Sequence, residues 1–463
     1  MSKSSSTHLL TAELRRLVQA GRPGDSLPST RDLVARFRVS PVTVSRAVAT
    51  VAAEGLLVSE PGRGTFVAAD DREPRVAADL GWQTVALAER VVDAGEAGRL
   101  LQIPEPGQLV LNSGYVDASL QPTHALGEAL ARAGRRPGAW GRAPVSGIAE
   151  LRTAMGALAG ADPADVLIVP GGQAGLSTAF RALASPGSPV LVESPTYQGA
   201  LAVARAAGLR PVPVPADCDG VRPEHLDQAF AMTGAKLFYA QPTFANPTGA
   251  VLPPERRAAV LDVVRARGAF LIEDDYAREL ALGAPAPRPL LHDDTDGHVV
   301  HLSSLSKVVA PSLRIGALIA RGPALARLRA LRTVDDFFVG RPLQETAVEL
   351  LASAAWPRHL SRLRRTLALR RDALVEAVRS ELPNVNIERV PQGGLHLWLR
   401  LPDGLDDTDV AAGCARRGLL VSPGTPYHAG EPPAPYLRLT YGGADIADLQ
   451  CGVEVLAAVL RTG

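Results

Sequence analysis

Lysine is rare in this sequence. Of 49 Lys and Arg residues, only Lys3, Lys236 and Lys307 are lysine. Arginine keeps its proton, whereas a lysine amine can lose it and form a Schiff base with an aldehyde. Lys3 lies in a polar N-terminal segment and Lys236 directly precedes an apolar run. Lys307 instead ends the polar segment 303–307, which directly follows the apolar run 299–302. It is therefore the candidate for covalent chemistry.

A Schiff-base lysine is the attachment point that pyridoxal 5′-phosphate needs, and the other groups of that cofactor need partners of their own. The pyridine nitrogen needs an acid, the phenolate oxygen needs hydrogen-bond donors, the phosphate needs an anion cradle and the ring needs a stacking surface. Residues of these types follow successive apolar runs. In chain order the candidates are Gly172, Gln173, Tyr197, Asn246, Asp274, Tyr276, Ser304, Ser306, Lys307 and Arg314.

Three parts of such a site are assigned by residue type. Asp274 follows the apolar run 269–272, where its carboxylate would keep the pyridine nitrogen protonated. Asn246, in an Asn-Pro-Thr-Gly segment, and Tyr276 can both donate to the phenolate oxygen. Tyr197 offers a face for stacking. Each residue alone has an ordinary explanation, such as a turn or a strand end. Their shared position after apolar runs predicts a single cofactor pocket.

The phosphate is expected at Gly172 and Gln173, which follow an apolar run and open a predicted helix. Free backbone N–H groups at a helix start, together with the helix dipole, favour an anion. Ser304 and Arg314 would complete this cradle, because a guanidinium binds phosphate oxygens in pairs. Ser306 is also placed among the cofactor-binding residues.

Short apolar runs separated by helical patterns place these residues on an α/β fold. The runs are 166–169, 190–192, 237–240, 269–272, 299–302 and 317–320. Such runs are typical of a mostly parallel sheet covered by helices on both faces, with functional groups at the carboxyl ends of the strands. We expect this α/β body over residues 108–463, preceded by a linker over residues 70–107.

Residues 1–69 have a different, basic character. They hold nine Lys or Arg and five Asp or Glu, a net charge of +4 in a chain whose total is +1. Apolar residues at helical spacing predict three helices, with Ser29 and Ser40 as N-caps of the second and third. Two β-prone runs, 56–59 and 65–67, flank a Pro-Gly-Arg-Gly turn and predict a hairpin.

Helix, turn, helix and basic hairpin together predict a winged DNA-binding domain over residues 1–69. The third helix would enter the major groove of double-stranded DNA, and the hairpin would contact the backbone or the minor groove. Hydroxyl and guanidinium groups can reach bases and phosphates. The candidate DNA-binding residues are Arg31, Ser40, Thr43, Arg46, Gly62 and Arg63.

These segments resemble the GntR family of winged-helix regulators over about residues 8–67. The resemblance is carried, in order and at the family's spacing, by residues 27–33, 39–44, 54–57 and 62–67. It implies DNA contacts from Arg31, Ser40, Thr43 and Gly62. Pro41 and Ser45 stand where the family often has arginines, so base recognition would rest on Arg46 or on fewer contacts.

The body is similar to the aminotransferases of fold type I. The similarity is carried by Asn246, Asp274, Ser304, Lys307 and Arg314 with their neighbours. It implies a pyridoxal-phosphate-dependent transferase fold, in which the large sheet domain is joined to a smaller C-terminal α+β subdomain. It also implies that Lys307 carries the cofactor, that Asp274 faces the pyridine nitrogen and that Arg314 binds the phosphate.

The same similarity adds one ligand-binding residue and shows one departure. Arg438, in Leu-Arg-Leu-Thr, matches the arginine that holds a substrate α-carboxylate, which is a bidentate task suited to guanidinium. Gly172 stands where the family usually has a phosphate-binding hydroxyl. Backbone N–H groups must therefore contribute more to phosphate binding here.

A GntR-type head on such a body is the layout of the MocR subfamily of regulators, whose body mainly senses. We expect a transcription regulator that recognises an amino compound, or pyridoxal 5′-phosphate itself, through an aldimine on Lys307. Bodies of this fold dimerise around shared active sites, which implies a homodimer on a promoter with paired half-sites. The alternative is a working aminotransferase with an accessory DNA-binding head, since every residue of the half-reaction is present.

Composition excludes several other classes. No apolar run approaches eighteen residues, and the N-terminus lacks the apolar stretch of a signal peptide. Cys218, Cys414 and Cys451 have neither disulfide nor zinc spacing. We therefore expect a cytoplasmic protein. The cluster of His292, Asp293 and Asp294 with His298 and His301 is interpreted as a solvated loop followed by a His301 that is buried in a strand, so no metal site is predicted.

Overall fold

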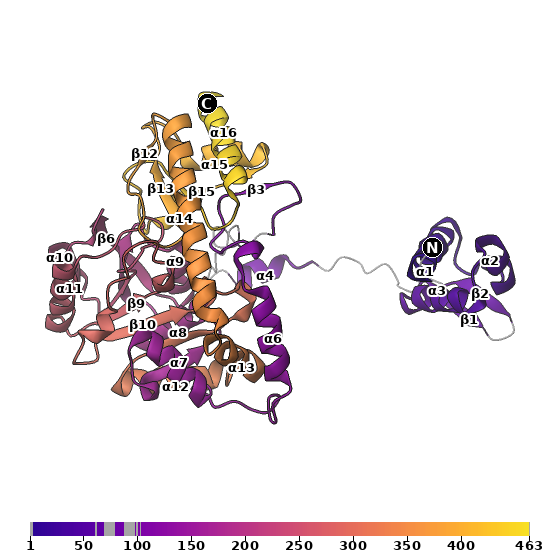
Figure 1. The fold of residues 1–463 in the computed structure, drawn as a ribbon, viewed down its shortest axis with the longest axis horizontal. Coiled ribbons are helices and arrows are strands. Elements are labelled where there is room, and N and C mark those ends of the chain that lie inside the picture. Colours follow the sequence, from indigo (N-terminus) through magenta and orange to yellow (C-terminus); the bar gives the residue numbers. More distant parts are fainter. Residues whose placement is uncertain are drawn as a thin grey trace. The chain divides into compact units, whose positions relative to one another are not determined.

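The computed structural model describes residues 3–60, 63–68, 79–87, 98, 101 and 103–462. The chain forms two compact units, Met1–Arg90 and Val91–Gly463, which we call the head and the body (Figure 1). Each unit has its own hydrophobic core. Among the described residues, no helix combines the length and the apolar character needed to span a membrane.

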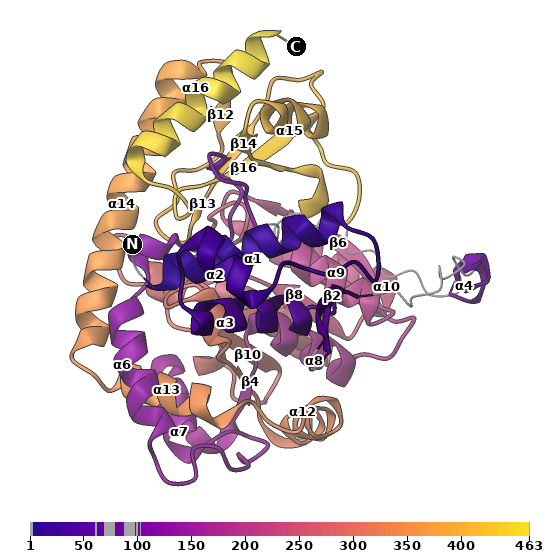
Figure 2. The ribbon, with the colours of Figure 1, turned by 90° about the vertical axis from the view of Figure 1, so that its right-hand side faces the viewer.

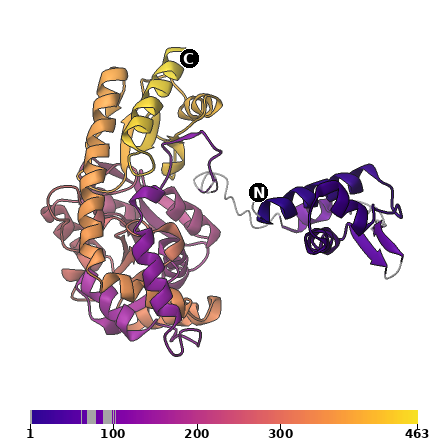
Figure 3. The ribbon, with the colours of Figure 1, turned by 45° about the vertical axis from the view of Figure 1, so that its right-hand side comes forward.

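The first part of the head, described over residues 3–60 and 63–68, contains three helices and a hairpin (Figure 3). Its elements are α1 (Lys3–Ala20), α2 (Thr30–Phe37), α3 (Pro41–Ala53), β1 (Leu57–Glu60) and β2 (Gly64–Val67). The strands pair antiparallel, with Leu57 opposite Val67. Apolar side chains spaced three or four residues apart on α1 and α3 meet in one core with Leu33 of α2. The predicted helix-turn-helix with a hairpin is thus present.

Side-chain caps fix where the second and third helices of the head begin. Ser29 accepts a hydrogen bond from the Asp32 backbone N–H, and the Asp32 carboxylate accepts one from the Ser29 backbone N–H. This is the reciprocal capping box that the sequence predicts. Ser40 caps α3 through the Thr43 N–H, with Pro41 at the first helical position. Arg38, at φ 50°, makes the turn between the two helices.

The predicted linker over residues 70–107 is described only in part. Its described residues include the short helix α4 (Gly81–Ala86), which buries none of its residues. Most of the remaining linker residues before position 103 lie outside the described part of the chain.

An eight-stranded sheet forms the centre of the body. Its order is β4-β11-β10-β9-β8-β5-β6-β7. The strands are β4 (Val166–Val169), β5 (Pro189–Ser194), β6 (Arg210–Asp217), β7 (Gly220–Val221), β8 (Leu237–Ala240), β9 (Phe270–Asp274), β10 (Val299–Ser304) and β11 (Gly316–Ile319). The pairings from β10 to β6 are parallel, whereas β11 and β7 run antiparallel to their neighbours. The sheet is therefore mixed, and mostly parallel as predicted.

Both faces of this sheet are covered by helices, which explains the continuous apolar strands. Leu167 and Val169 of β4 face one core, and Val166 and Ile168 face the other, because successive side chains point to opposite sides. The first core includes α8 (Gly172–Leu183), α9 (Gln198–Ala206) and α12 (Gly322–Asp335). The second includes α7 (Ala149–Ala159), α10 (Pro223–Thr233), α11 (Pro254–Ala266) and α13 (Arg341–Leu351). Helix α6 (Thr123–Gly134) packs on α13.

A smaller α+β subdomain follows the sheet, as the resemblance implies. Its antiparallel sheet has the order β12-β13-β16-β15, with β12 (Asn386–Ile387), β13 (His396–Arg400), β16 (Tyr436–Thr440) and β15 (Ser422–Pro423). Helix α15 (Asp407–Arg416) and strand β14 (Leu419–Leu420) complete it, and β14 pairs with β3 (Leu109–Val110) from the start of the body. The long α14 (Ala355–Glu381) packs along α16 (Ile446–Thr462) (Figure 2).

The capping box gives a prediction for the head. Replacing Ser29 with Ala removes the acceptor of the Asp32 N–H and should destabilise the start of α2 by about 1 kcal/mol. Amide hydrogen exchange of residues 30–37 in the full chain should then become roughly fivefold faster. Ser45→Ala, at an exposed position within α3, is the matched control and should leave α2 unchanged. Unaltered exchange in Ser29→Ala would show that the cap does not stabilise α2.

Candidate functional site

A cavity of about 360 Å³ lies where the carboxyl ends of the body's strands meet. Gly172 follows β4, Asp274 ends β9 and Ser304 ends β10, so parallel strands bring distant segments to one edge of the sheet. All eleven residues predicted for the cofactor and ligand line this cavity: Gly172, Gln173, Tyr197, Asn246, Asp274, Tyr276, Ser304, Ser306, Lys307, Arg314 and Arg438.

Lys307 points its amine into the cavity. Its Nζ lies 3.7 Å from the centre of the Tyr115 ring, a contact that favours the charged form. Burial opposes that form, and so do the guanidinium groups of Arg438 and Arg314, with the result that the pKa of Lys307 falls to about 7. An amine with this pKa is largely neutral at slightly alkaline pH, which is the state that attacks an aldehyde.

Asp274 presents one carboxylate oxygen to the cavity and has the other fixed. Its Oδ2 accepts hydrogen bonds from the Tyr239 hydroxyl at 2.7 Å and from Gln241 Nε2 at 2.8 Å. Burial raises the pKa of Asp274 to about 6, although these two donors lower it. Within the described part of the chain, Oδ1 receives no hydrogen bond. It is therefore available to a protonated ring nitrogen.

The residues predicted as a phosphate cradle line the cavity at the start of α8. The first backbone N–H groups of a helix have no partner within the helix. No side chain of the described residues caps α8, so these groups remain free for an anion. The Arg314 guanidinium donates to the Pro170 carbonyl at 2.9 Å beside it. Gly171 has φ 87°, and a Cβ there would lie 2.9 Å from the Arg314 guanidinium. Glycine thus allows the cation to approach the helix start.

Ser306 completes the cradle with an unused hydroxyl. Its Oγ is buried and has no hydrogen-bond partner among the described residues. The neighbouring Ser304 Oγ accepts from the Ser306 backbone N–H at 3.2 Å and can still donate its own proton. Two hydroxyls, one guanidinium and the helix N–H groups fit a phosphate without a side-chain hydroxyl at position 172.

Tyr197 lines the cavity and is held in a fixed orientation. Its hydroxyl donates to Gln173 Oε1 at 3.0 Å, and Gln173 Nε2 donates to the Gly199 carbonyl at 2.9 Å. A Cβ at position 199 would lie 2.3 Å from the Tyr197 ring. Glycine there lets the ring pack against the start of α9, which supports the predicted stacking role.

The two predicted donors to the phenolate oxygen differ in availability. Asn246 accepts from Arg438 Nη1 at 3.3 Å, and its backbone N–H donates to Gln241 Oε1 at 2.9 Å. The side-chain NH₂ of Asn246 is then left to donate. The Tyr276 hydroxyl instead donates to the Phe244 carbonyl at 2.9 Å. It must turn away from that carbonyl before it can donate to a ligand.

Arg438 is fully buried and has no acidic partner within ion-pair distance among the described residues. It lies over the Tyr427 ring, with 5.3 Å from its guanidinium carbon to the ring centre. It also donates to the Asn112 carbonyl and to Ser422 Oγ, while its Nε has no partner. An unpaired buried cation is costly. Arg438 is therefore suited to a ligand carboxylate.

Three residues of the cavity were missed by the sequence analysis. Tyr115 lies under the Lys307 amine, Gln241 joins Asn246 to Asp274, and the buried His396 lines the wall. Burial and the cations Arg438 and Lys307 hold the pKa of His396 well below its usual value, so this ring is neutral. Nothing local in the sequence indicates these residues, because each reaches the cavity only through tertiary packing.

In the head, the candidate DNA-binding residues lie on α2, α3 and the hairpin turn. Arg31 and Arg46 are exposed, and neither has an acidic partner within ion-pair distance in the described part of the chain. Ser40 Oγ is engaged by the cap of α3 and lies 2.9 Å from Thr43 Oγ1. The exposed guanidinium of Arg63 pairs with Glu60 at 2.6 Å. Gly62 lies outside the described residues.

The His- and Asp-rich segment 292–301 is not simply a solvated loop. Asp294 is buried, and its carboxylate accepts the Val299 N–H at 2.8 Å and the Asp296 N–H at 3.2 Å. His301 is buried beside Glu273 at 2.9 Å, a neighbour that raises the pKa of His301 against the effect of burial. Each of these groups has its own partner in the core. His301 is buried as predicted, whereas the prediction was wrong for Asp294, because two backbone N–H groups hold this acid inside.

The two units match two known families. Residues 9–67 match the gntR family of bacterial regulatory proteins, and residues 106–456 match the aminotransferase class I and II family. The regulator TauR of Rhodobacter capsulatus is 30% identical over 98% of this chain and 96% of its own length. The uncharacterized HTH-type transcriptional regulator YdfD of Bacillus subtilis is 27% identical over 95% of this chain and 92% of its own.

A solved structure matches the body. The crystal structure of LysN, an alpha-aminoadipate aminotransferase from Thermus thermophilus complexed with N-(5′-phosphopyridoxyl)-L-leucine, is 30% identical with a TM-score of 0.77. It covers 83% of this chain and 99% of that one. The chain thus belongs to the aminotransferase class I and II family, with a fold-type-I body and a GntR head that binds DNA.

Together, the head and the body define the chain as a transcription regulator of the MocR type. Its cofactor is pyridoxal 5′-phosphate, as in this family of aminotransferases. Three features of the cavity suit this cofactor. Among the described residues, the Ser306 hydroxyl and Asp274 Oδ1 have no hydrogen-bond partner, and no side chain caps the start of α8.

The pKa of Lys307 gives a prediction for the protein without cofactor. Only the neutral amine reacts with fluorodinitrobenzene, so labelling of Lys307 should rise about tenfold per pH unit and level off near pH 7. Quantification of the labelled peptide across a pH series measures this midpoint, with Lys307→Arg as the control for peptide assignment. A rate that is still rising tenfold per unit at about pH 9 would contradict the depressed pKa.

The exposed arginine of α3 gives a prediction for DNA binding. Arg46→Ala should weaken binding to the protein's own promoter and lower the slope of log affinity against log salt by about 0.9, the effect of one lost phosphate contact. Fluorescence anisotropy at several salt concentrations measures both. Arg379→Ala removes an exposed arginine of the body and should change neither. Equal loss in both variants would mean that only net charge matters.

Proposed function

We propose that the body senses an amino compound, or pyridoxal 5′-phosphate itself, through covalent attachment of the cofactor at Lys307, and that this occupancy sets the DNA affinity of the head. One observation carries the proposal: the chain joins a DNA-binding head to a body with a cation-rich pocket. Among the described residues, neither Lys307 nor Arg438 of this pocket has an anionic partner within ion-pair distance. Such a pocket calls for a ligand with both a carbonyl or amine function and an anionic group.

Each residue of the pocket has a distinct task in this proposal. When bound, pyridoxal 5′-phosphate supplies an aldehyde that reacts with primary amines. Lys307 would hold it covalently, and the cradle of Ser304, Ser306 and Arg314 would hold its phosphate. Asp274 Oδ1 would keep a proton on the ring nitrogen. Arg438 would bind the carboxylate of an incoming amino acid through two parallel hydrogen bonds.

The second candidate function is a working aminotransferase, and the pKa of Lys307 favours it. A pKa of about 7 suits an amine that accepts and returns a proton near neutral pH. The same residues would serve both functions, so the difference lies in whether a bound amino acid is converted or retained. If the bound amino acid is retained, a sensor is favoured, because the complex that shifts the conformational equilibrium persists.

Assembly and location belong to the same proposal. We expect a homodimer, because a promoter with paired half-sites matches a two-fold symmetric protein. Large exposed apolar side chains on the body, such as Trp140 at 81% and Phe337 at 66% exposure, are suited to a second copy. Contact with promoter DNA requires the cytoplasm in a bacterium.

Covalent trapping and DNA binding test the proposal together. Borohydride reduction of the loaded protein followed by peptide mapping should place the label on Lys307. Addition of amino acids one at a time should shift promoter affinity about tenfold for at least one compound in the wild type, and not in Lys307→Ala. A label on Lys236, or no label, contradicts the attachment site. Rapid release of keto acid with unchanged DNA affinity identifies an aminotransferase instead.

A further inference from the structure

A second cavity, of about 440 Å³, lies in the body between the edge of the large sheet and the C-terminal subdomain. It has the size of a small-molecule site and shares no lining residue with the cofactor pocket. One wall comes from β6 and the end of β5, and the other from β13, β16 and the segment around His428. The function proposed above makes no use of it.

The wall on the sheet side is apolar and offers few donors. Pro213 and Pro215 of β6 line the cavity together with Pro195, which follows β5. Proline has no N–H and is tolerated at a sheet edge, where β6 pairs with the short β7 only at its end. A ligand would thus pack an apolar surface against this wall.

The opposite wall is aromatic. Trp398 and Tyr436 are stacked with their ring centres 4.9 Å apart and an interplanar angle of 11°, and His428 lies 6.0 Å from Tyr436. His428 is 7% exposed, and its Nε2 has no hydrogen-bond partner among the described residues. Burial lowers the pKa of His428 to about 4, so the ring is neutral at physiological pH and adds no positive charge.

The charges around the cavity leave an acidic excess. Arg256 pairs with Asp217 at 2.6 Å, and Arg389 pairs with Asp219 at 2.6 Å. The other two acids of the lining, Glu388 and Glu431, are exposed and have no basic partner within ion-pair distance in the described part of the chain. Burial and the neighbouring Glu388 raise the pKa of the Tyr436 hydroxyl.

We propose that this cavity is a second small-molecule site, which takes an organic cation on an apolar body. Aromatic faces attract cations, a role that falls to the half-buried Tyr436 because Trp398 is only 2% exposed. The carboxylates Glu388 and Glu431, which lack basic partners in the described part of the chain, add to that attraction. The proline wall accommodates the apolar part of the ligand. No cation in the lining is left unpaired, so an anion would find no free partner.

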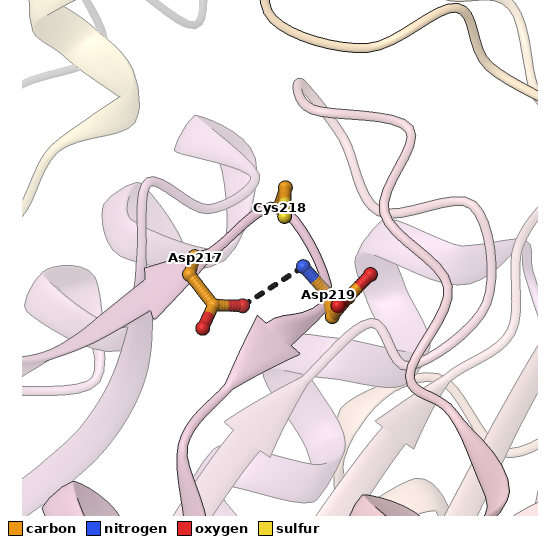
Figure 4. Close-up of side chains that lie close together, drawn as sticks. All are labelled: Asp217, Cys218 and Asp219. Carbon is orange, nitrogen blue, oxygen red and sulfur yellow. Dashed lines mark hydrogen bonds between the residues drawn. The ribbon is translucent and has the colours of Figure 1, made fainter.

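A metal ion is a poorer occupant of the same region. Asp217, Cys218 and Asp219 lie together at the turn between β6 and β7 (Figure 4). Arginines already pair with both carboxylates, and Asp217 also accepts the Asp219 backbone N–H at 2.8 Å. This arrangement is that of a closed turn. The exposed Cys218, which lines the cavity, instead provides a probe of its occupancy.

An occupant would contact segments that also build the cofactor pocket. Thr248 of the lining lies two residues after Asn246, and Ser194 lies three residues before Tyr197. His428 directly follows Tyr427, whose ring supports Arg438. The two sites are therefore adjacent along three segments, although they are separate cavities.

Calorimetric titration with (2-phenylethyl)trimethylammonium tests the proposal. This cation has no N–H and cannot bond to an aldehyde, and borohydride-reduced holoprotein keeps the cofactor pocket filled. We expect saturable binding of one cation per chain, with weaker binding of 2-phenylethanol and of 3-phenylpropionate. Alkylation of Cys218 by iodoacetamide should slow in the presence of the cation, while that of the exposed Cys451 should not.

Variants of the exposed acids test whether their charges attract the cation. The double variant Glu388→Gln, Glu431→Gln should lower the affinity for the cation about fivefold, which is the combined effect of removing two surface charges. Glu454→Gln, an exposed acid of α16 outside the cavity, should leave the affinity unchanged. Absence of binding overturns the proposal, and so does equal affinity for the anion or an unchanged affinity in the double variant. None of these outcomes bears on covalent attachment at Lys307.

Discussion

The body holds an excess of positively charged groups in one buried pocket. Lys307, Arg314 and Arg438 converge on a cavity in which Asp274 is the only lining carboxylate among the described residues. Burial lowers the pKa of the Lys307 amine, and the neighbouring arginines lower it further, which explains the value of about 7. The positive charge that remains on the two arginines, and on Lys307 when it is protonated, requires anionic groups in the pocket. A phosphate between Arg314 and the start of α8, and a carboxylate at Arg438, meet that requirement.

The rest of the body holds these charges in position. Parallel strands bring Asp274, Ser304 and the start of α8 to one edge of the sheet, and the antiparallel subdomain adds Arg438 from the far end of the chain. Gln241 connects the two parts, since it donates to Asp274 and accepts from Asn246, which in turn accepts from Arg438. Anything bound at Arg438 is thus linked by three hydrogen bonds to the carboxylate that faces the ring nitrogen. Binding at one end can be sensed at the other.

The head and the second cavity turn a catalytic fold towards regulation. The head provides exposed arginines on α2 and α3 for DNA, whereas the second cavity offers proline, aromatic and acidic walls. The two small-molecule sites have opposite charge preferences and meet along the segments of Asn246, Tyr197 and Tyr427. A protein with this arrangement can combine two chemical signals in one DNA-binding response.

The sequence by itself determined the local features. Caps at Ser29 and Ser40, six apolar strands and ten of the pocket residues were predictable, because turns, periodicity and residue type act over short distances. Arg438 came instead from the resemblance to the aminotransferases of fold type I. Only the tertiary structure decided the rest. It placed Tyr115 under Lys307, turned the Tyr276 hydroxyl to Phe244 and drew Asp294 into the core. It also formed β6 from a proline-rich segment and set it against the subdomain to enclose the second cavity. Contacts between residues far apart in the chain depend on packing, which no local pattern encodes.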